Sequence, residues 1–169
     1  MTAKEKQNLL IKTQLKPQLK NADYQNKGQT WWKEKEEFFT VINLQNFSWN
    51  DRDNVDFCFN IGIALKANLR DKEKGKPTAH DLTVYLRENF FLPKQRQENG
   101  FRNKSGYILK TETDFNEFAD ELISDFVNHI LPYLESINTL KDCLSHFGEI
   151  TFWGENLKRV MRENNLIDA

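Results

Sequence analysis

The sequence has few of the residues on which metal sites, disulfide frameworks and many catalytic centres depend. Its 169 residues include two cysteines, Cys58 and Cys143, and three histidines, His80, His129 and His146. They form neither a CxxC nor an HxxxH pattern, so the spacings typical of zinc sites are absent and we expect no metal and no cofactor. Because the two cysteines lie far apart in the sequence, we expect buried thiols rather than a disulfide.

Long apolar runs are also missing. No stretch approaches the roughly 20 apolar residues that a membrane-spanning helix needs. The chain begins Met-Thr-Ala-Lys-Glu-Lys-Gln, which lacks the apolar segment of a secretory signal. These features predict a cytoplasmic protein with no membrane partner.

Two partial motif matches fail when their spacing is tested. With Asp51 at the first position of a calcium loop, the sixth position holds Asp56 instead of glycine and the twelfth holds Gly62 instead of glutamate. A phosphate loop starting at Gly100 needs a second glycine five positions later, where Ser105 stands. No GxSxG or HExxH motif occurs. The sequence therefore points to a non-enzymatic protein with no catalytic residues.

What the sequence does contain is enough apolar surface for one folded domain. Hydrophobic residues make up 38% and charged residues 29%, and the 13 Phe can fill a core from few positions. We predict a single α+β domain over residues 1–169, with its core at about 3–147 and a C-terminal helical extension at about 150–169.

Hydrophobic periodicity predicts the order of the elements. Apolar residues at helical spacing indicate a helix at about 3–20, and alternation then predicts strands at 29–35, 38–47, 55–65 and 106–111, with 82–90 as strand or helix. In 55–65 every second residue from Val55 to Leu65 is apolar, as in a strand covered by helices on one face. Residues 66–77 and 91–105 read as charged loops, the second a mobile one.

A long helix with an N-cap at Thr113 follows the strands, and we expect Pro132 to kink or end it. Two further helices are predicted at about 137–147 and 155–164. Because the strands follow one another without crossover helices, the sequence predicts an antiparallel sheet preceded by one helix and followed by two or three helices packed on it.

Charge is distributed unevenly along the chain. Residues 1–35 carry eight Lys against three acidic residues, whereas residues 112–169 carry four basic against twelve acidic residues. Glu117, Glu121 and Asp125 recur every four residues on the long helix and form a candidate acidic stripe for binding a partner protein. A row of lysines on the first helix could instead face this stripe, or both could be ordinary solvated helix faces; the row is Lys12, Lys16 and Lys20.

Polar side chains in the middle of the sheet form the second candidate site. Asn43, Gln45 and Asn60 fall on one face of two central strands, and Arg87 from the next candidate strand can add a charge. Amides are disfavoured in strands, so they either satisfy one another's hydrogen bonds or line a shallow polar pocket.

A basic loop gives a third, weaker signal. Lys94, Arg96, Arg102 and Lys104 surround Phe101, a combination seen in nucleic-acid-binding surfaces. The chain has no recognisable nucleic-acid-binding motif and a net charge of -1, so a nucleic-acid partner is not expected.

Two strand segments carry a family resemblance. The stretches Phe-Thr-Val-Ile-Asn-Leu-Gln at 39–45 and Phe-Cys-Phe-Asn-Ile-Gly-Ile at 57–63, with Leu-Lys-Pro at 15–17 and Leu-Pro-Tyr-Leu at 131–134, resemble a bacterial family catalogued as domain of unknown function 4304. The resemblance spans roughly residues 7–144. The segments at 23–28 and around Arg87 and Tyr107 depart from the family pattern. The resemblance implies an α+β fold and no known reaction.

Together these observations predict an interaction protein, of an accessory or immunity type, that binds an unidentified protein through its acidic C-terminal face. The alternative is a small-ligand-binding domain, or an unrecognised enzyme, that uses the polar sheet face.

Overall fold

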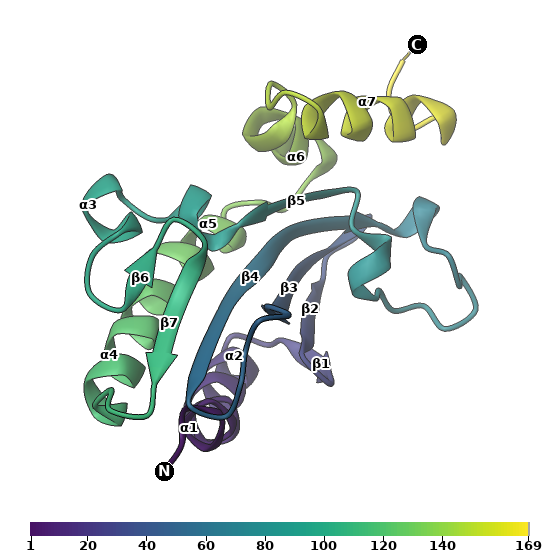
Figure 1. Ribbon diagram of the computed structural model, residues 1–169. Helices are drawn as coiled ribbons and strands as arrows, with labels where there is room; N and C mark the ends of the chain where they lie inside the picture. The colour runs from purple at the N-terminus through teal and green to yellow at the C-terminus, as the bar shows by residue number, and fades with distance from the viewer. Residues whose placement is uncertain (169) are drawn as a thin grey trace.

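Seven strands form one antiparallel sheet in the computed structural model, which describes residues 1–168 (Figure 1). The strands are β1 (Gln25–Lys27), β2 (Thr30–Glu34), β3 (Phe38–Asn46), β4 (Asn54–Leu65), β5 (Val84–Arg87), β6 (Arg102–Asn103) and β7 (Gly106–Lys110). Their order is β1-β2-β3-β4-β7-β6, and β5 also pairs with β4. An N-terminal helix precedes the sheet and further helices follow it, which confirms the predicted α+β fold.

The two central strands are β3 and β4. β3 is buried on both faces over Phe38–Ile42 and lies between β2 and β4. β4 turns its alternating apolar residues, from Val55 to Leu65, into the main hydrophobic core. Phe57 and Phe59 fill the centre of this core and are completely buried.

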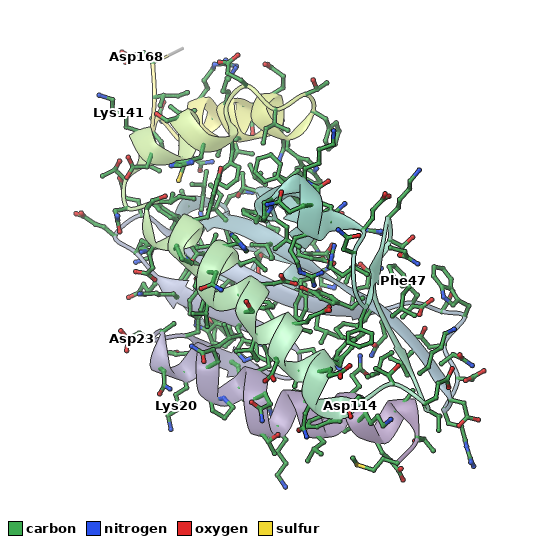
Figure 2. The ribbon with its side chains drawn as sticks, turned by 90° about the vertical axis from the view of Figure 1, so that its left-hand side faces the viewer. Lys20, Asp23, Phe47, Asp114, Lys141 and Asp168 are labelled. Carbon is green, nitrogen blue, oxygen red and sulfur yellow. The ribbon has the colours of Figure 1, made fainter. Side chains whose placement is uncertain are left out.

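Two long helices cover the core face of the sheet and lie side by side in Figure 2. The first runs through α1 (Ala3–Leu10), a π turn (Ile11–Leu15) and α2 (Lys16–Asn21). The second runs through α4 (Phe115–Asp125), a π turn (Phe126–Ile130) and α5 (Leu131–Glu135). It begins at the N-cap Asp114, whose side chain accepts from the amide of Glu117, one residue later than predicted.

Of the two outcomes predicted for Pro132, a kink or the end of the helix, the end does not occur at this residue. A π turn precedes it, just as a π turn precedes Pro17 in the first helix. The π turn shifts the hydrogen-bond partners of the backbone by one residue, so a proline without an N–H is accommodated and the helix continues to Glu135.

The remaining helices are short and lie near one end of the sheet or on its periphery. They are α3 (Lys94–Gln97), α6 (Leu140–Phe147) and α7 (Trp153–Glu163), with 3-10 turns at Lys66–Asn68, Ala79–Asp81 and Glu88–Phe91. Figure 1 shows α6 and α7 beside β5, at the end of the sheet away from the N-terminus. Leu157 and Met161 of α7 are completely buried in the main cluster, so the core extends beyond residue 147.

β4 pairs with two different strands along the same edge, and a buried carboxylate lies between them. β7 pairs with Asn54–Phe57, whereas β5 pairs with Asn60–Ile63. In the gap, the amide of Phe59 donates to Glu88 Oε2 at 2.8 Å. Burial raises the pKa of Glu88 against the opposing effect of Arg102, whose Nη1 lies 2.9 Å from Glu88 Oε1. The side chains of Arg102 and Glu88 are 0% and 1% exposed to solvent.

Arg102 extends this ion pair into a polar network within the fold. Its Nε donates to the carbonyl of Gln97 and its Nη2 donates to Asn89 Oδ1, at 3.2 and 2.6 Å. Its guanidinium group lies 4.4 Å from the ring centre of Tyr107, a cation–π contact. The Tyr107 hydroxyl in turn donates to Asp125 Oδ2 at 2.8 Å, which connects the sheet to α4.

Arg96 closes the network from the other side. Its Nε and Nη2 lie 2.7 and 2.8 Å from the two oxygens of Asp125, a bidentate ion pair, and Nη2 also lies 3.1 Å from Glu121 Oε2. The same oxygen of Glu121 accepts from the amide of Phe101. The segment 91–105 is therefore not the mobile loop that we predicted, because two of its arginines bind buried carboxylates.

The Glu88–Arg102 pair generates a prediction about stability. Arg102→Met leaves Glu88 charged and buried without its partner, so we expect the free energy of unfolding to fall by about 3–5 kcal/mol. Adding Glu88→Gln to this variant should restore part of the loss, because the amide oxygen still accepts from Phe59 and no charge remains buried. Urea unfolding measures both effects, and Arg52→Met is the control because the Arg52 side chain is 77% exposed. An unchanged midpoint for Arg102→Met would contradict the structural role of the pair.

Candidate functional site

The predicted polar face is assembled in register across three strands. Asn43 of β3 lies opposite Asn60 of β4, and Asn60 lies opposite Arg87 of β5. Asn60 Nδ2 donates to Gln45 Oε1 at 2.9 Å and to Asn43 Oδ1 at 3.4 Å. The structure therefore brings together all four residues that the sequence singled out, on the face of the sheet opposite the two long helices. We call these four residues the amide face.

The amides satisfy one another only in part. Asn43 Nδ2 donates to Thr30 Oγ1 at 2.9 Å, which extends the hydrogen-bonded row to β2. Within residues 1–168, Asn60 Oδ1 and Gln45 Nε2 have no hydrogen-bond partner. Asn43 and Asn60 are half-buried and Gln45 is exposed, so the row has one acceptor and one amide donor group available to a ligand.

Arg87 adds a positive charge and leads to a group of aromatic rings. Its guanidinium group lies 5.3 Å from the ring centre of Phe47, and its Nη1 donates to the carbonyl of Ser105 at 3.4 Å. It has no carboxylate partner within residues 1–168. Phe47 stacks on Trp49 with 4.6 Å between ring centres, and Trp49 is 62% exposed. The exposed cation therefore lies beside an exposed aromatic surface.

Gly62 permits the close approach of β5 on which the amide face depends. It lies on the same face, between Val41 of β3 and Tyr85 of β5. A Cβ atom at position 62 would lie 1.8 Å from the carbonyl oxygen of Val84. Any larger residue would push β5 away and separate Arg87 from Asn60.

The far end of this face is covered by the chain segment that follows β4. Five buried residues form a second, smaller hydrophobic cluster there, with Leu82 packed against it; they are Trp32, Phe39, Val41, Ala64 and Leu69. A cavity of about 270 Å³ lies beside this cluster, and Thr30 and Trp32 contribute to its wall. The same Thr30 bonds to the amide face, so the cavity and the amide face are neighbours.

Asp81 fixes the shape of the segment that covers this end. Its Oδ1 accepts from the Arg70 amide at 2.8 Å, and its Oδ2 accepts from the Thr78 amide and hydroxyl at 2.7 and 3.0 Å. Burial acts to raise the pKa of Asp81, but these hydrogen bonds outweigh it and the pKa is lowered. From the sequence we predicted only a charged loop at 66–77. The capping-box spacing Thr-x-x-Asp at 78–81 is the sequence signal for the turn that closes this segment.

The acidic stripe is divided by the fold. Glu117 is exposed, but Asp125 is buried and ion-paired with Arg96, and Glu121 also binds Arg96. Two of the three carboxylates of the acidic stripe therefore form ion pairs within the fold instead of a solvated helix face. The spacing of four residues could not show this, because the arginine comes from a distant segment.

The lysine row does not neutralise the acidic stripe. Lys12, Lys16 and Lys20 are exposed, and within residues 1–168 none of them lies in an ion pair with the stripe. Contact between the two helical segments is made instead by Lys6, whose Nζ donates to the carbonyls of Thr111 and Thr113 at the start of the second helix.

The basic loop offers less charge to a nucleic acid than its sequence indicated. Arg96 and Arg102 are both bound to carboxylates inside the fold. Lys94 and Lys104 remain exposed, and two lysines alone do not form a basic stripe.

Neither cysteine has the properties of a catalytic nucleophile. Cys58 lies opposite Gln45 on the same side of the sheet as the amide face and Cys143 lies in α6, and both are free and buried. Burial raises the pKa of the Cys58 thiol to about 11 and that of Cys143 to about 12. Within residues 1–168 no group of three or more His, Cys, Asp or Glu side chains is placed to hold a metal ion, and no helix there has both the length and the apolarity needed to cross a membrane.

Comparison with known families identifies the chain. Residues 15–136 match the family described as Domain of unknown function (DUF4304), and the chain belongs to this family. No curated protein and no solved structure matches the chain. The amide face lies entirely within the matched region.

The bonds of Asp81 generate a prediction about pH. Because its pKa is lower in the folded state than the value of about 3.9 in an unfolded chain, Asp81 stabilises the fold above that value and loses this effect as the pH falls through the folded pKa. We therefore expect Asp81→Asn to lower the thermal midpoint at pH 7 and to lower it much less near pH 2–3. Equal losses at both pH values would show that the carboxylate charge does not matter, and thermal unfolding across pH 2–7 measures the difference.

Proposed function

We propose that this member of the DUF4304 family is a non-enzymatic binding protein that takes up an anionic ligand on the amide face. The observation that carries the proposal is the alignment of Asn43, Asn60 and Arg87 across three strands, with a free acceptor on Asn60 and a cation that pairs with no carboxylate within residues 1–168.

The chemistry of the face favours binding over catalysis. Amides and a guanidinium group neither accept nor release protons near neutral pH, so they can hold a ligand but cannot act as general acid or base. Cys58, a titratable group beside them on β4, is buried with a raised pKa. A face of this kind recognises shape, hydrogen bonds and charge.

The unpaired cation favours an anionic ligand. Arg87 presents planar N–H donors that match a carboxylate or a phosphate, and no carboxylate within residues 1–168 occupies them. The stacked rings of Phe47 and Trp49 next to it provide an apolar surface for the remainder of the ligand.

Two substitutions test the amide face. Arg87→Ala and Asn60→Ala should each weaken binding of a small anion that copurifies with the protein, by about tenfold or more, because a hydrogen bond to a charged group contributes about 1.5–3 kcal/mol. The ligand is identified by mass spectrometry of the denatured protein, and its affinity is measured by calorimetry. Both side chains reach solvent, so the thermal midpoint should change by only a few degrees.

The matched controls are Arg52→Ala and Gln14→Ala, which remove an exposed guanidinium and an exposed amide elsewhere. If these controls weaken binding as much as the two test variants, or if the test variants bind normally, the amide face is not the site. If Asn60→Ala unfolds the protein, the amides are structural and the proposal fails.

A second candidate function is the binding of a basic partner protein, in an accessory or immunity role, through the start of α4. The observation in its favour is that Glu112, Glu117 and Asp120 are exposed and lie in no ion pair within residues 1–168.

This candidate is tested by reversing charges at residues other than Glu121 and Asp125 of the acidic stripe. Reversing Glu121 and Asp125 would break the Arg96 network, so Glu112, Glu117 and Asp120 are changed to Lys instead. A partner recovered by affinity pull-down at low salt should be lost from this variant. It should be retained by the control that carries the same charge change at Glu36, Glu37 and Glu73. Equal recovery by both variants would eliminate the acidic surface.

A further inference from the structure

The cavity at the end of the amide face is bordered by cations from two parts of the chain. Lys27 comes from the hairpin of β1 and β2, and Arg70 and Lys76 come from the segment 70–81 that follows β4. Trp32 forms part of the wall between them, and the cavity holds about 270 Å³. Figure 1 shows this segment as the long teal loop that extends beyond the end of β4.

The cations around the cavity exceed the carboxylates that oppose them. Lys74 lies 3.7 Å from Asp71, an exposed pair that uses one charge of each sign. Lys27, Arg70 and Lys76 lie in no ion pair within residues 1–168. Three positive charges therefore border one cavity without an ion-pair partner within residues 1–168, and an anion bound among them would relieve their mutual repulsion.

Asp81, the remaining carboxylate at the cavity, forms no ion pair with these cations, although the charge of Arg70 helps to lower its pKa. Both of its oxygens accept hydrogen bonds from the backbone of Arg70 and from Thr78. These bonds hold the two ends of the 70–78 stretch together, so the cavity wall is shaped before any ligand arrives. Such preorganisation reduces the entropy lost on binding.

The wall behind the cations is apolar. Trp32 is 6% exposed and packs with Phe39, Leu69 and Leu82 in the second hydrophobic cluster. Its indole N–H donates no hydrogen bond within residues 1–168. The cavity thus combines a cationic rim with an apolar wall that carries one available donor, which is the pattern of a site for a small charged organic molecule.

We propose that this cavity binds a small phosphate monoester, with the phosphate held by Lys27, Arg70 and Lys76 and the organic part against Trp32. A phosphate monoester carries a charge of about -1.5 to -2 at pH 7 and three acceptor oxygens, which matches several convergent cations better than a single carboxylate does. Lysine contributes point charges and arginine a planar pair of donors, both common in phosphate sites.

Titration with phenyl phosphate tests the proposal, because this probe joins a phosphate monoester to a flat apolar ring. The four tryptophans give four indole N–H signals in a ¹⁵N-correlated NMR spectrum, and Trp32→Phe assigns the one that belongs to Trp32. We expect the Trp32 signal to shift saturably with phenyl phosphate and not with phenol. A Trp32 signal that does not move, or one that moves equally with phenol, would overturn the proposal.

Charge-removing variants locate the site. Lys27→Met and Lys76→Met should each raise the dissociation constant of phenyl phosphate at least about fivefold, because each removes a cation in contact with the phosphate. Lys72→Met is the control: it removes the same charge from the same segment but does not line the cavity. If Lys72→Met weakens binding as much as the other two, the probe responds to the general charge of the segment and the cavity is not the site.

The outcome is separable from the test of the amide face. Arg87→Ala should leave the affinity that the Trp32 signal reports unchanged, because this signal comes from the cavity wall and Arg87 lies across two further strands from Thr30. If Arg87→Ala abolishes binding while Lys27→Met and Lys76→Met do not, the cavity proposal is wrong and the amide face is the phosphate site. If Lys27→Met and Lys76→Met weaken binding and Arg87→Ala does not, the cavity proposal is supported whatever the result for the amide face.

Discussion

The carboxylate of Glu88, bonded to the amide of Phe59, allows one long strand to pair with two others along a single edge. A backbone N–H left unpaired in the core would destabilise the fold, and so would a buried carboxylate without a cation. Arg102 supplies the cation that pairs with Glu88. Its guanidinium group also contacts Tyr107, whose hydroxyl donates to Asp125 and connects the sheet to α4. The position of the second long helix therefore depends on the polar network at the point where β4 stops pairing with β7 and begins to pair with β5.

The two faces of the sheet also differ in burial and in polarity. The aromatic side chains of β4 and the network around Arg102 lie on the helix-covered side, where burial is nearly complete. The opposite side is left with half-buried amides, an unpaired guanidinium and a small apolar cluster at one end. Because stability is supplied mainly from the covered side, the residues on the open side can serve recognition.

Local patterns determined which parts of the structure could be predicted from the sequence. The alternation in β4 placed its apolar residues on one face, and the same two-residue period correctly grouped Asn43, Gln45 and Asn60. The ion pairs of Arg96 and Arg102 could not be predicted, because each joins residues that are far apart in sequence, and a charged loop reads as solvated until its partners are known. For Pro132 the sequence left open whether the helix would kink or end, because a π turn has no sequence signature as clear as the proline itself.

The shortness of β1 and β6, the strands at the two ends of the sheet order, affects whether copies of the chain can aggregate. β1 and β6 have three and two residues, and the exposed side chains of these two strands are polar or charged. A long, flat and apolar edge invites another strand to add by backbone hydrogen bonding, which is a common route to aggregation. Here β1 and β6 have too few residues to template such an addition. The sheet can thus expose the polar side chains of the amide face without offering β1 or β6 as a border on which fibrils could grow.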